Sequence, residues 1–144
     1  MINIEPTARA LMLSDALQTF PNECCGFMFG TEDEEGNRII SEIMVVDNAK
    51  EGDKTRRFEI SPVDYLKAER HASASDRLLL GIYHSHPRHP AVPSEHDRKA
   101  AQPYFSYVII SVHDAENTGI RSWRLNENEQ FEEENLGFFQ FNLS

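Results

Sequence analysis

The chain has 144 residues, of which 40% are hydrophobic, and 24 acidic against 14 basic residues give it a formal net charge of −10. This size predicts one domain spanning residues 1–144, large enough to bury a core without disulfide or metal staples. The negative charge argues against nucleic acid as a partner, and no apolar run approaches the roughly 18 residues of a membrane span. The only cysteines, Cys24 and Cys25, are adjacent, which is poor geometry for a disulfide and favours a reducing cytoplasm; one of the two is expected to be buried.

The first part of the chain predicts a helix followed by two strands. Glu5-Pro6-Thr7 is typical of a helix start, so a helix is expected over about residues 6–20, with apolar residues recurring at helical spacing (Ala10, Leu13, Leu17, Phe20). Residues 24–30 (CCGFMFG) and 38–46 are predicted strands, separated by an acidic turn.

Residues 47–57 (DNAKEGDKTRR) are polar and lack periodicity, which indicates a long loop. Four cations stand out there against the acidic background: Lys50, Lys54, Arg56 and Arg57. They are either solvated or help to dock an acidic protein partner.

The second half alternates strands and helices. A short strand is expected over residues 58–60, then a helix over 62–74 that Ser61 caps and whose apolar stripe contains Val63, Leu66 and residues 68–72. Further strands are predicted over residues 78–86, 104–112, 120–125 and 131–136, and a helix over about 95–102. The strand at 104–112 is apolar on both faces, as a central strand is, whereas 131–136 carries three glutamates typical of an edge. The class is therefore α/β, with a mixed, curved sheet flanked by helices.

The final residues, 138–141, form an apolar tail that packs either on the body of the protein or on a second copy. The sequence leaves the oligomeric state open.

Residues 81–97 (GIYHSHPRHPAVPSEHD) hold four of the six histidines. Alternate strand residues share a face, so His84 and His86 should point the same way, with their Cβ atoms roughly 6–7 Å apart. Ser94 is a natural N-cap, which puts Asp97 in the first helical turn, facing back toward the loop. Two imidazoles and one carboxylate would leave the fourth position of a tetrahedral zinc open, as in catalytic sites.

Each of these elements also has a purely structural interpretation. A histidine pair on a strand is more often a polar face, and Ser94 with Asp97 can form a capping box and nothing more. Glu23 by itself is typical of an exposed loop carboxylate. His89 and His96 are expected to be solvated.

The joint pattern resembles a known family. His84-x-His86-Pro87, six residues, Ser94, two residues and Asp97 match the signature of the JAMM (MPN+) metalloproteases, and Pro21-Asn22-Glu23-Cys24-Cys25-Gly26 matches the family's upstream glutamate segment. The resemblance is greatest to the short stand-alone prokaryotic members. It implies a JAMM/MPN fold of cytidine-deaminase-like architecture, Zn²⁺ held by His84, His86 and Asp97, and catalytic roles for Glu23 and Ser94.

The resemblance also implies an activity. Glu23 would take a proton from a zinc-activated water and hand it to the leaving amine, while Ser94 would hydrogen-bond the oxygen of the tetrahedral intermediate. The expected substrate is a ubiquitin-like or sulfur-carrier protein adduct, cleaved after its C-terminal Gly-Gly tail. Two alternatives stay open: a metal-free MPN scaffold, and a DNA-repair-associated relative that typically has Asn where this chain has Ser85. A zinc deaminase is disfavoured because its Pro-Cys-x-x-Cys ligand pair is absent.

Overall fold

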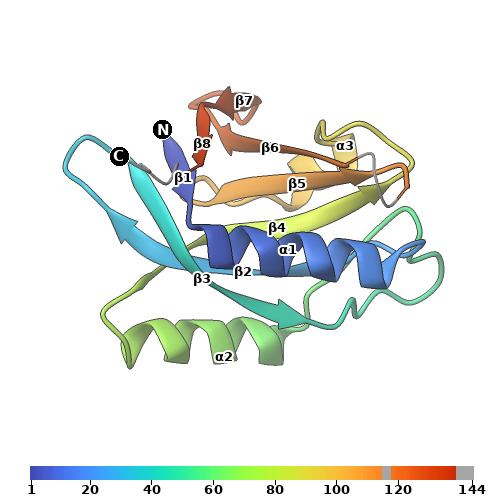
Figure 1. Cartoon of the computed structure of the whole chain (residues 1–144), viewed down its shortest axis with the longest axis horizontal. Helices are drawn as coiled ribbons and strands as arrows, with labels where there is room; N and C mark the ends of the chain where they lie inside the picture. Colours follow the sequence, from blue (N-terminus) through green and yellow to red (C-terminus); the bar gives the residue numbers. More distant parts are fainter. Residues whose placement is uncertain (115–117, 139–144) are drawn as a thin grey trace, which may run out of the picture.

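The computed structural model describes residues 1–114 and 118–138, which form a single eight-stranded mixed sheet and three helices (Figure 1). The predicted tail after Phe138 lies outside the described residues. In chain order the elements are β1 (Ile2–Ile4), α1 (Pro6–Thr19), β2 (Cys25–Glu32), β3 (Arg38–Val46), α2 (Pro62–Ser73), β4 (Leu78–Pro87), α3 (Glu95–Ala100), β5 (Ser106–Val112), β6 (Thr118–Leu125), β7 (Phe131–Glu134) and β8 (Leu136–Phe138).

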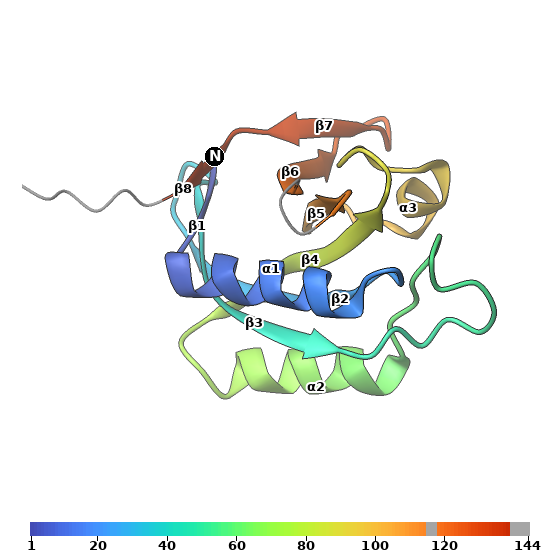
Figure 2. The same ribbon diagram turned by 45° about the vertical axis from the view of Figure 1, so that its right-hand side comes forward.

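The sheet curves until its two ends adjoin. Its strand order is β7-β6-β5-β4-β2-β3-β1-β8, so β7 and β8 lie at opposite ends although only Asn135 separates them in sequence (Figure 2). The Asn135 carbonyl accepts a hydrogen bond of 2.9 Å from the Ile2 amide. β4 and β5 run parallel at the centre, and their outer neighbours β2 and β6 are antiparallel to them. The predicted α/β class with a mixed, curved sheet is confirmed.

Helices α1 and α2 cover opposite faces of the sheet (Figure 2). Strand β2 shows the alternation directly, because Met28 packs in the cluster under α1 whereas Phe27 and Phe29 pack in the cluster under α2. The predicted stripe of α1 is partly wrong. The residues it buries are Ala8, Met12 and Ala16, and Ala10 and Leu17 are exposed.

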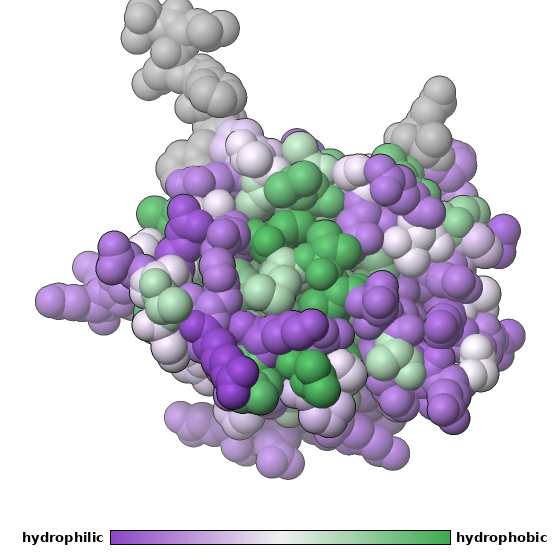
Figure 3. Space-filling model, turned by 90° about the horizontal axis from the view of Figure 1, so that it is seen from below, coloured by the Kyte–Doolittle hydropathy of each residue, from purple (hydrophilic) through white to green (hydrophobic). Residues whose placement is uncertain are grey.

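The predicted stripe of α2 is also partly wrong. Ala68 is buried and Tyr65 and Ala72 pack beside it, but Val63 and Leu66 are exposed. Seen from the side on which α2 lies, hydrophobic side chains form a patch between polar ones (Figure 3). The short helix therefore buries small and aromatic residues and leaves part of its apolar surface in contact with solvent.

One strand was missed and two further expectations need correction. β1 was not predicted, because its partners are β3 and β8, far along the chain. Residues 58–60 are not a strand: the Glu59 amide donates to the Asn48 side chain (3.2 Å) and the Glu59 carbonyl accepts from Ala49 (2.8 Å), which joins this segment to the preceding loop. The segment 131–136 is two strands rather than one, of which β7 is the predicted edge.

An irregularity in β4 sets the direction of the histidines. The β2–β4 register shifts between Met28 and Phe29, and Leu79 and Ile82 both pack on the α2 side although they are three positions apart, an odd number. Such a bulge reverses the alternation downstream. Gly81 lies at this point, where an added Cβ would stand 1.9 Å from the Ser106 carbonyl oxygen. A glycine is therefore required for β4 and β5 to pair closely.

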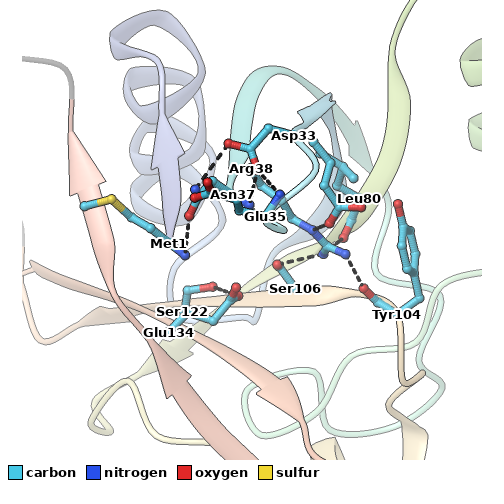
Figure 4. Close-up of polar contacts among 11 residues, drawn as sticks. Met1, Asp33, Glu35, Asn37, Arg38, Leu80, Tyr104, Ser106, Ser122 and Glu134 are labelled. Atoms are coloured by element: carbon cyan, nitrogen blue, oxygen red, sulfur yellow. Dashed lines mark hydrogen bonds and ion pairs between the residues drawn. The ribbon is translucent and has the colours of Figure 1, made fainter.

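Arg38 connects β2, β4 and β5 at the strand ends that lie away from His84 and His86 (Figure 4). Its fully buried side chain donates to the Glu32 carboxylate (2.7 Å), to the Leu80 carbonyl (3.0 Å), to Ser106 Oγ (2.9 Å) and to the Tyr104 carbonyl (2.8 Å). One cation thus satisfies acceptors at the end of β2, near the start of β4 and at the entry to β5.

Cys24 and Cys25 are both buried and free, so the expectation that only one is buried was wrong. No helix in the described ranges is long and apolar enough to cross a bilayer.

Candidate metal centre

Three side-chain atoms converge where β4 ends. His84 Nε2 lies 3.2 Å from His86 Nε2, and Asp97 Oδ2 lies 3.3 Å from the first nitrogen and 3.1 Å from the second. These distances make a nearly equilateral triangle. A tetrahedral zinc with bonds of about 2.0–2.1 Å separates its ligand atoms by about 3.3 Å. The donor set and its spacing therefore fit a tetrahedral metal ion.

Strand β4 supplies the two histidines, and the first turn of α3 supplies the aspartate. Ser94 Oγ accepts the Asp97 amide at 3.0 Å, and Asp97 Oδ2 accepts the Ser94 amide at 2.9 Å, which completes a capping box. The same Oδ2 atom faces both imidazoles. The capping and metal-binding interpretations of Asp97 are thus compatible, because the cap fixes the carboxylate in the position that a ligand needs.

The tautomer of His86 suits metal binding. His86 Nδ1 lies 2.9 Å from the Pro90 carbonyl oxygen, to which it can only donate, so the lone pair of the neutral ring is on Nε2. Burial lowers the pKa of His86, but Asp97, Pro90 and Glu23 outweigh it and raise that pKa, so a metal ion at Nε2 takes the place of a proton. Burial lowers the pKa of His84 and favours its neutral form, and its ring stacks on Phe58 at 4.5 Å. Burial opposes ionisation of Asp97, but His84 and His86 outweigh it and hold the Asp97 pKa well below its usual range.

Glu23 stands beside this triangle. It is only 4% exposed, its Oε1 has no hydrogen-bond partner among the described residues, and one of its oxygens lies within 4.8 Å of a ring nitrogen of each histidine. Asp97 approaches the histidines more closely, so Asp97 rather than Glu23 completes the triangle. Burial raises the pKa of Glu23 to about 8, which brings its proton exchange near neutral pH.

The loop before residue 58 holds Glu23 in place. The Glu23 amide donates to the Lys54 carbonyl (2.7 Å), and Asn48 Nδ2 donates to the carbonyls of Glu23 and Arg57, each at 3.0 Å. From the other side, buried Ser85 accepts the Cys24 amide at 2.8 Å.

Sequence reasoning missed the supporting roles of Asn48, Ser85 and Pro90. The contact between Ser85 and Cys24 spans 61 positions of the chain and that between Asn48 and Glu23 spans 25. No local pattern could have revealed contacts of this kind.

Two cavities flank the three converging atoms. A cavity of about 350 Å³, here called the aromatic cavity, includes His84 and Asp97 in its wall together with Phe58, Ile60, Tyr65, Ile82, His96 and Tyr107. A second, of about 580 Å³, here called the Glu23 cavity, is lined by Glu23, Arg56, His86, His89, Pro90, Val92 and Ser94. His89 and His96, expected to be simply solvated, therefore each border one side of the site.

The site consists of two histidines at the end of the central strand β4 and an aspartate from α3. A nearly closed mixed sheet with such a site defines a class of α/β domain that can hold a metal ion. The chain belongs to the family described as prokaryotic homologs of the JAB domain, whose model matches residues 6–126, and the predicted resemblance to the JAMM/MPN family is confirmed.

Relatives with assigned names are peptidases. A CysO-cysteine peptidase of Mycobacterium tuberculosis is 30% identical over 115 residues, which cover 79% of this chain and 75% of the relative. A Thermus thermophilus relative named as a TtuB-protein conjugate cleaving protease is 32% identical over 95 residues, covering 66% and 60% of the two chains. A desampylase of Pyrococcus furiosus is 29% identical over 112 residues, covering 77% and 72%.

Solved structures share the fold. A protein from Desulfitobacterium hafniense superposes with a TM-score of 0.86 at 28% identity, covering 98% of this chain and 94% of its own. A JAB1/MPN domain protein from Archaeoglobus fulgidus gives 0.61 at 17% identity, covering 96% and 99%, and this likeness concerns the fold alone.

Proposed function

We propose that this protein is a zinc-dependent peptidase or isopeptidase that hydrolyses the bond after the C-terminal Gly-Gly tail of a ubiquitin-like or sulfur-carrier protein adduct. The observation that carries the proposal is the triangle of His84, His86 and Asp97, with a buried carboxylate beside it whose Oε1 has no partner among the described residues. The names of the relatives, which are peptidases acting on CysO-cysteine or on protein conjugates, support the substrate class.

Glu23 and Ser94 have separate roles in the proposed reaction. Zinc, when bound, would supply Lewis-acid activation of water at neutral pH. Glu23 accepts the proton of the attacking water and passes it to the departing amine. Ser94 Oγ already accepts the Asp97 amide, and since a hydroxyl has one donor and two acceptor sites, its O–H stays available to donate to the developing oxyanion. Such a donor typically contributes about 3–4 kcal/mol to transition-state stabilisation.

The aromatic cavity is the proposed channel for the Gly-Gly tail. The backbone N–H and C=O of Glu59 both hydrogen-bond to the preceding loop. The backbone N–H and C=O groups of Phe58 and Ile60 have no hydrogen-bond partner in the described part of the chain. An extended tail can therefore pair with this segment as an added strand. Tyr65, Tyr107 and Phe58 line this cavity with large rings, so residues without side chains are expected at the last two positions of the tail.

The proposal is tested by measuring zinc content and cleavage together. Glu23→Gln should retain one zinc per chain and lose turnover, whereas His84→Ala should lose both. Zinc is measured by elemental analysis, and cleavage by intact mass after incubation with C-terminally extended carriers that end in Gly-Gly. His71→Ala is the control, since His71 pairs with Glu42 (2.6 Å) and lines neither cavity described above.

A purified chain that binds no zinc would support the metal-free scaffold alternative and refute the proposal. A zinc-loaded chain that cleaves none of the carriers would refute the substrate class.

A further inference from the structure

The Glu23 cavity is the side on which the leaving group departs, an inference that rests on the proposed function. The amine must receive its proton from Glu23, so it leaves where that carboxylate lies. Glu23 and Ser94 both line the Glu23 cavity, and neither is in the wall of the aromatic cavity. The two cavities therefore receive the two halves of the substrate: the carrier tail in one and the departing amine in the other.

Among the described residues, Arg56 is the one arginine or lysine that lines this cavity. The other side chains there that take no part in the proposed zinc binding or catalysis are those of His89, Pro90 and Val92. In the described part of the chain Arg56 makes one long ion pair, Nε to Asp53 Oδ2 at 3.7 Å, and its side chain is 80% exposed. Arginine presents five N–H donors in a planar fork that matches a carboxylate, so most of this fork stays available to a ligand.

Arg56 is held near the leaving side by the loop that carries it. The Lys54 carbonyl, two residues earlier, accepts the Glu23 amide at 2.7 Å, and the Arg57 carbonyl, one residue later, accepts Asn48 Nδ2, which also binds Glu23. Asp53, which pairs with Arg56, is itself fixed because it accepts the Thr55 amide at 2.9 Å. The backbone on both sides of Arg56 is thus anchored to the backbone of the proposed general base.

We propose that Arg56 determines leaving-group specificity by binding the α-carboxylate of a single amino acid attached through its amino group to the carrier's last glycine. In such an adduct the carboxylate is one carbon away from the departing nitrogen. A lysine side chain in an isopeptide bond brings only an aliphatic chain to this place. Hydrolysis breaks the C–N bond, water oxygen remains on the glycine carboxylate, and the proton moves through Glu23 to the free amino group.

The test uses the zinc-loaded protein and a carrier that it cleaves, extended by one alanine either as the free acid or as the carboxamide. The wild type should prefer the acid by about 10-fold in kcat/KM, mainly through KM, as expected for a charge-assisted contact that solvent partly screens. Arg56→Gln should reduce the acid/amide ratio toward one, and Arg56→Lys should restore part of it. Lys67→Gln, the same charge change on the exposed surface of α2, should leave the ratio unchanged.

Equal rates for acid and amide in the wild type, or an unchanged ratio in Arg56→Gln, would overturn this inference and leave the proposed function intact. Faster cleavage of a lysine isopeptide conjugate than of the free-acid adduct would also overturn it. If the zinc-loaded wild type cleaves no carrier, the proposed function fails, and the inference fails with it.

Discussion

At the scale of single residues, the proposed function gives Ser94 a catalytic role in addition to its observed role as a helix cap, and the chain provides a control that separates the two. Ser94→Ala should lower kcat by about 10²–10³ through loss of the oxyanion donor, and should destabilise the fold by about 1 kcal/mol through loss of the cap. Ser61 makes the same cap at α2, accepting the Asp64 amide at 3.1 Å, but lies outside both cavities. Ser61→Ala should therefore show the stability cost alone, measured by denaturant unfolding and steady-state kinetics. Equal kcat losses in the two variants would show that Ser94 acts only as a cap.

The buried Arg38 guanidinium stabilises the packing of β2, β4 and the entry to β5 at the strand ends away from the histidines. Arg38→Met leaves the Glu32 carboxylate and the carbonyls of Leu80 and Tyr104 without their donor, so it should cost about 3–5 kcal/mol of unfolding free energy. Arg121→Met removes a surface pair with Glu133 (2.7 and 2.8 Å) and should cost less than about 1 kcal/mol. Urea titrations of both variants measure the difference. Similar costs would mean that the buried network contributes little.

At the scale of elements, the bulge in β4 links packing to the site. Gly81→Ala would place a methyl group 1.9 Å from a backbone oxygen of β5, so the strands must separate, at a cost of about 1–3 kcal/mol. Because His84 and His86 follow on the same strand, zinc affinity should fall as well. Among the described residues, Gly119→Ala in β6 meets only Ser111 Oγ, at 3.1 Å, which can rotate away, and should be nearly neutral. Calorimetric zinc titration and thermal unfolding test both. Wild-type affinity in Gly81→Ala would contradict the role given to the bulge.

Most elements, and the proposed metal ligands and catalytic residues, could be named from the sequence, whereas the supporting residues Asn48, Ser85 and Pro90 could not. His84, His86, Ser94 and Asp97 lie within 14 positions, where strand alternation and a helix cap are local rules. Glu23 was placed by the family pattern and not by any local rule. Two errors concern short segments: β1 is defined by partners distant in sequence and residues 58–60 by side-chain and loop contacts, and neither is long enough to show a period of its own. The stripe of α1 was misplaced because the buried face carries Ala8, Met12 and Ala16 rather than Ala10 and Leu17. In α2 the alanines were predicted correctly, but Val63 and Leu66 lie outside the face that packs on the sheet.

At the scale of the whole molecule, the site joins β4 to α3, and Glu23 at the entry to β2 stands beside it, so metal binding should stabilise the entire fold. Zinc at 100 times its Kd should add about 2.7 kcal/mol to the unfolding free energy, since the ligands converge only in the folded chain. The shift should persist in Glu23→Gln and disappear in His84→Ala, as measured by thermal unfolding with and without chelator. Stabilisation of His84→Ala equal to that of the wild type would locate zinc elsewhere.

The most direct test of the metal centre is anomalous diffraction at the zinc edge from crystals of the zinc-loaded protein. The peak should lie about 2.0–2.2 Å from His84 Nε2, His86 Nε2 and an Asp97 carboxylate oxygen, with Glu23 beyond bonding distance. No peak at this triangle, or a peak bonded to Glu23 in place of Asp97, would contradict the assignment of ligands and proton acceptor.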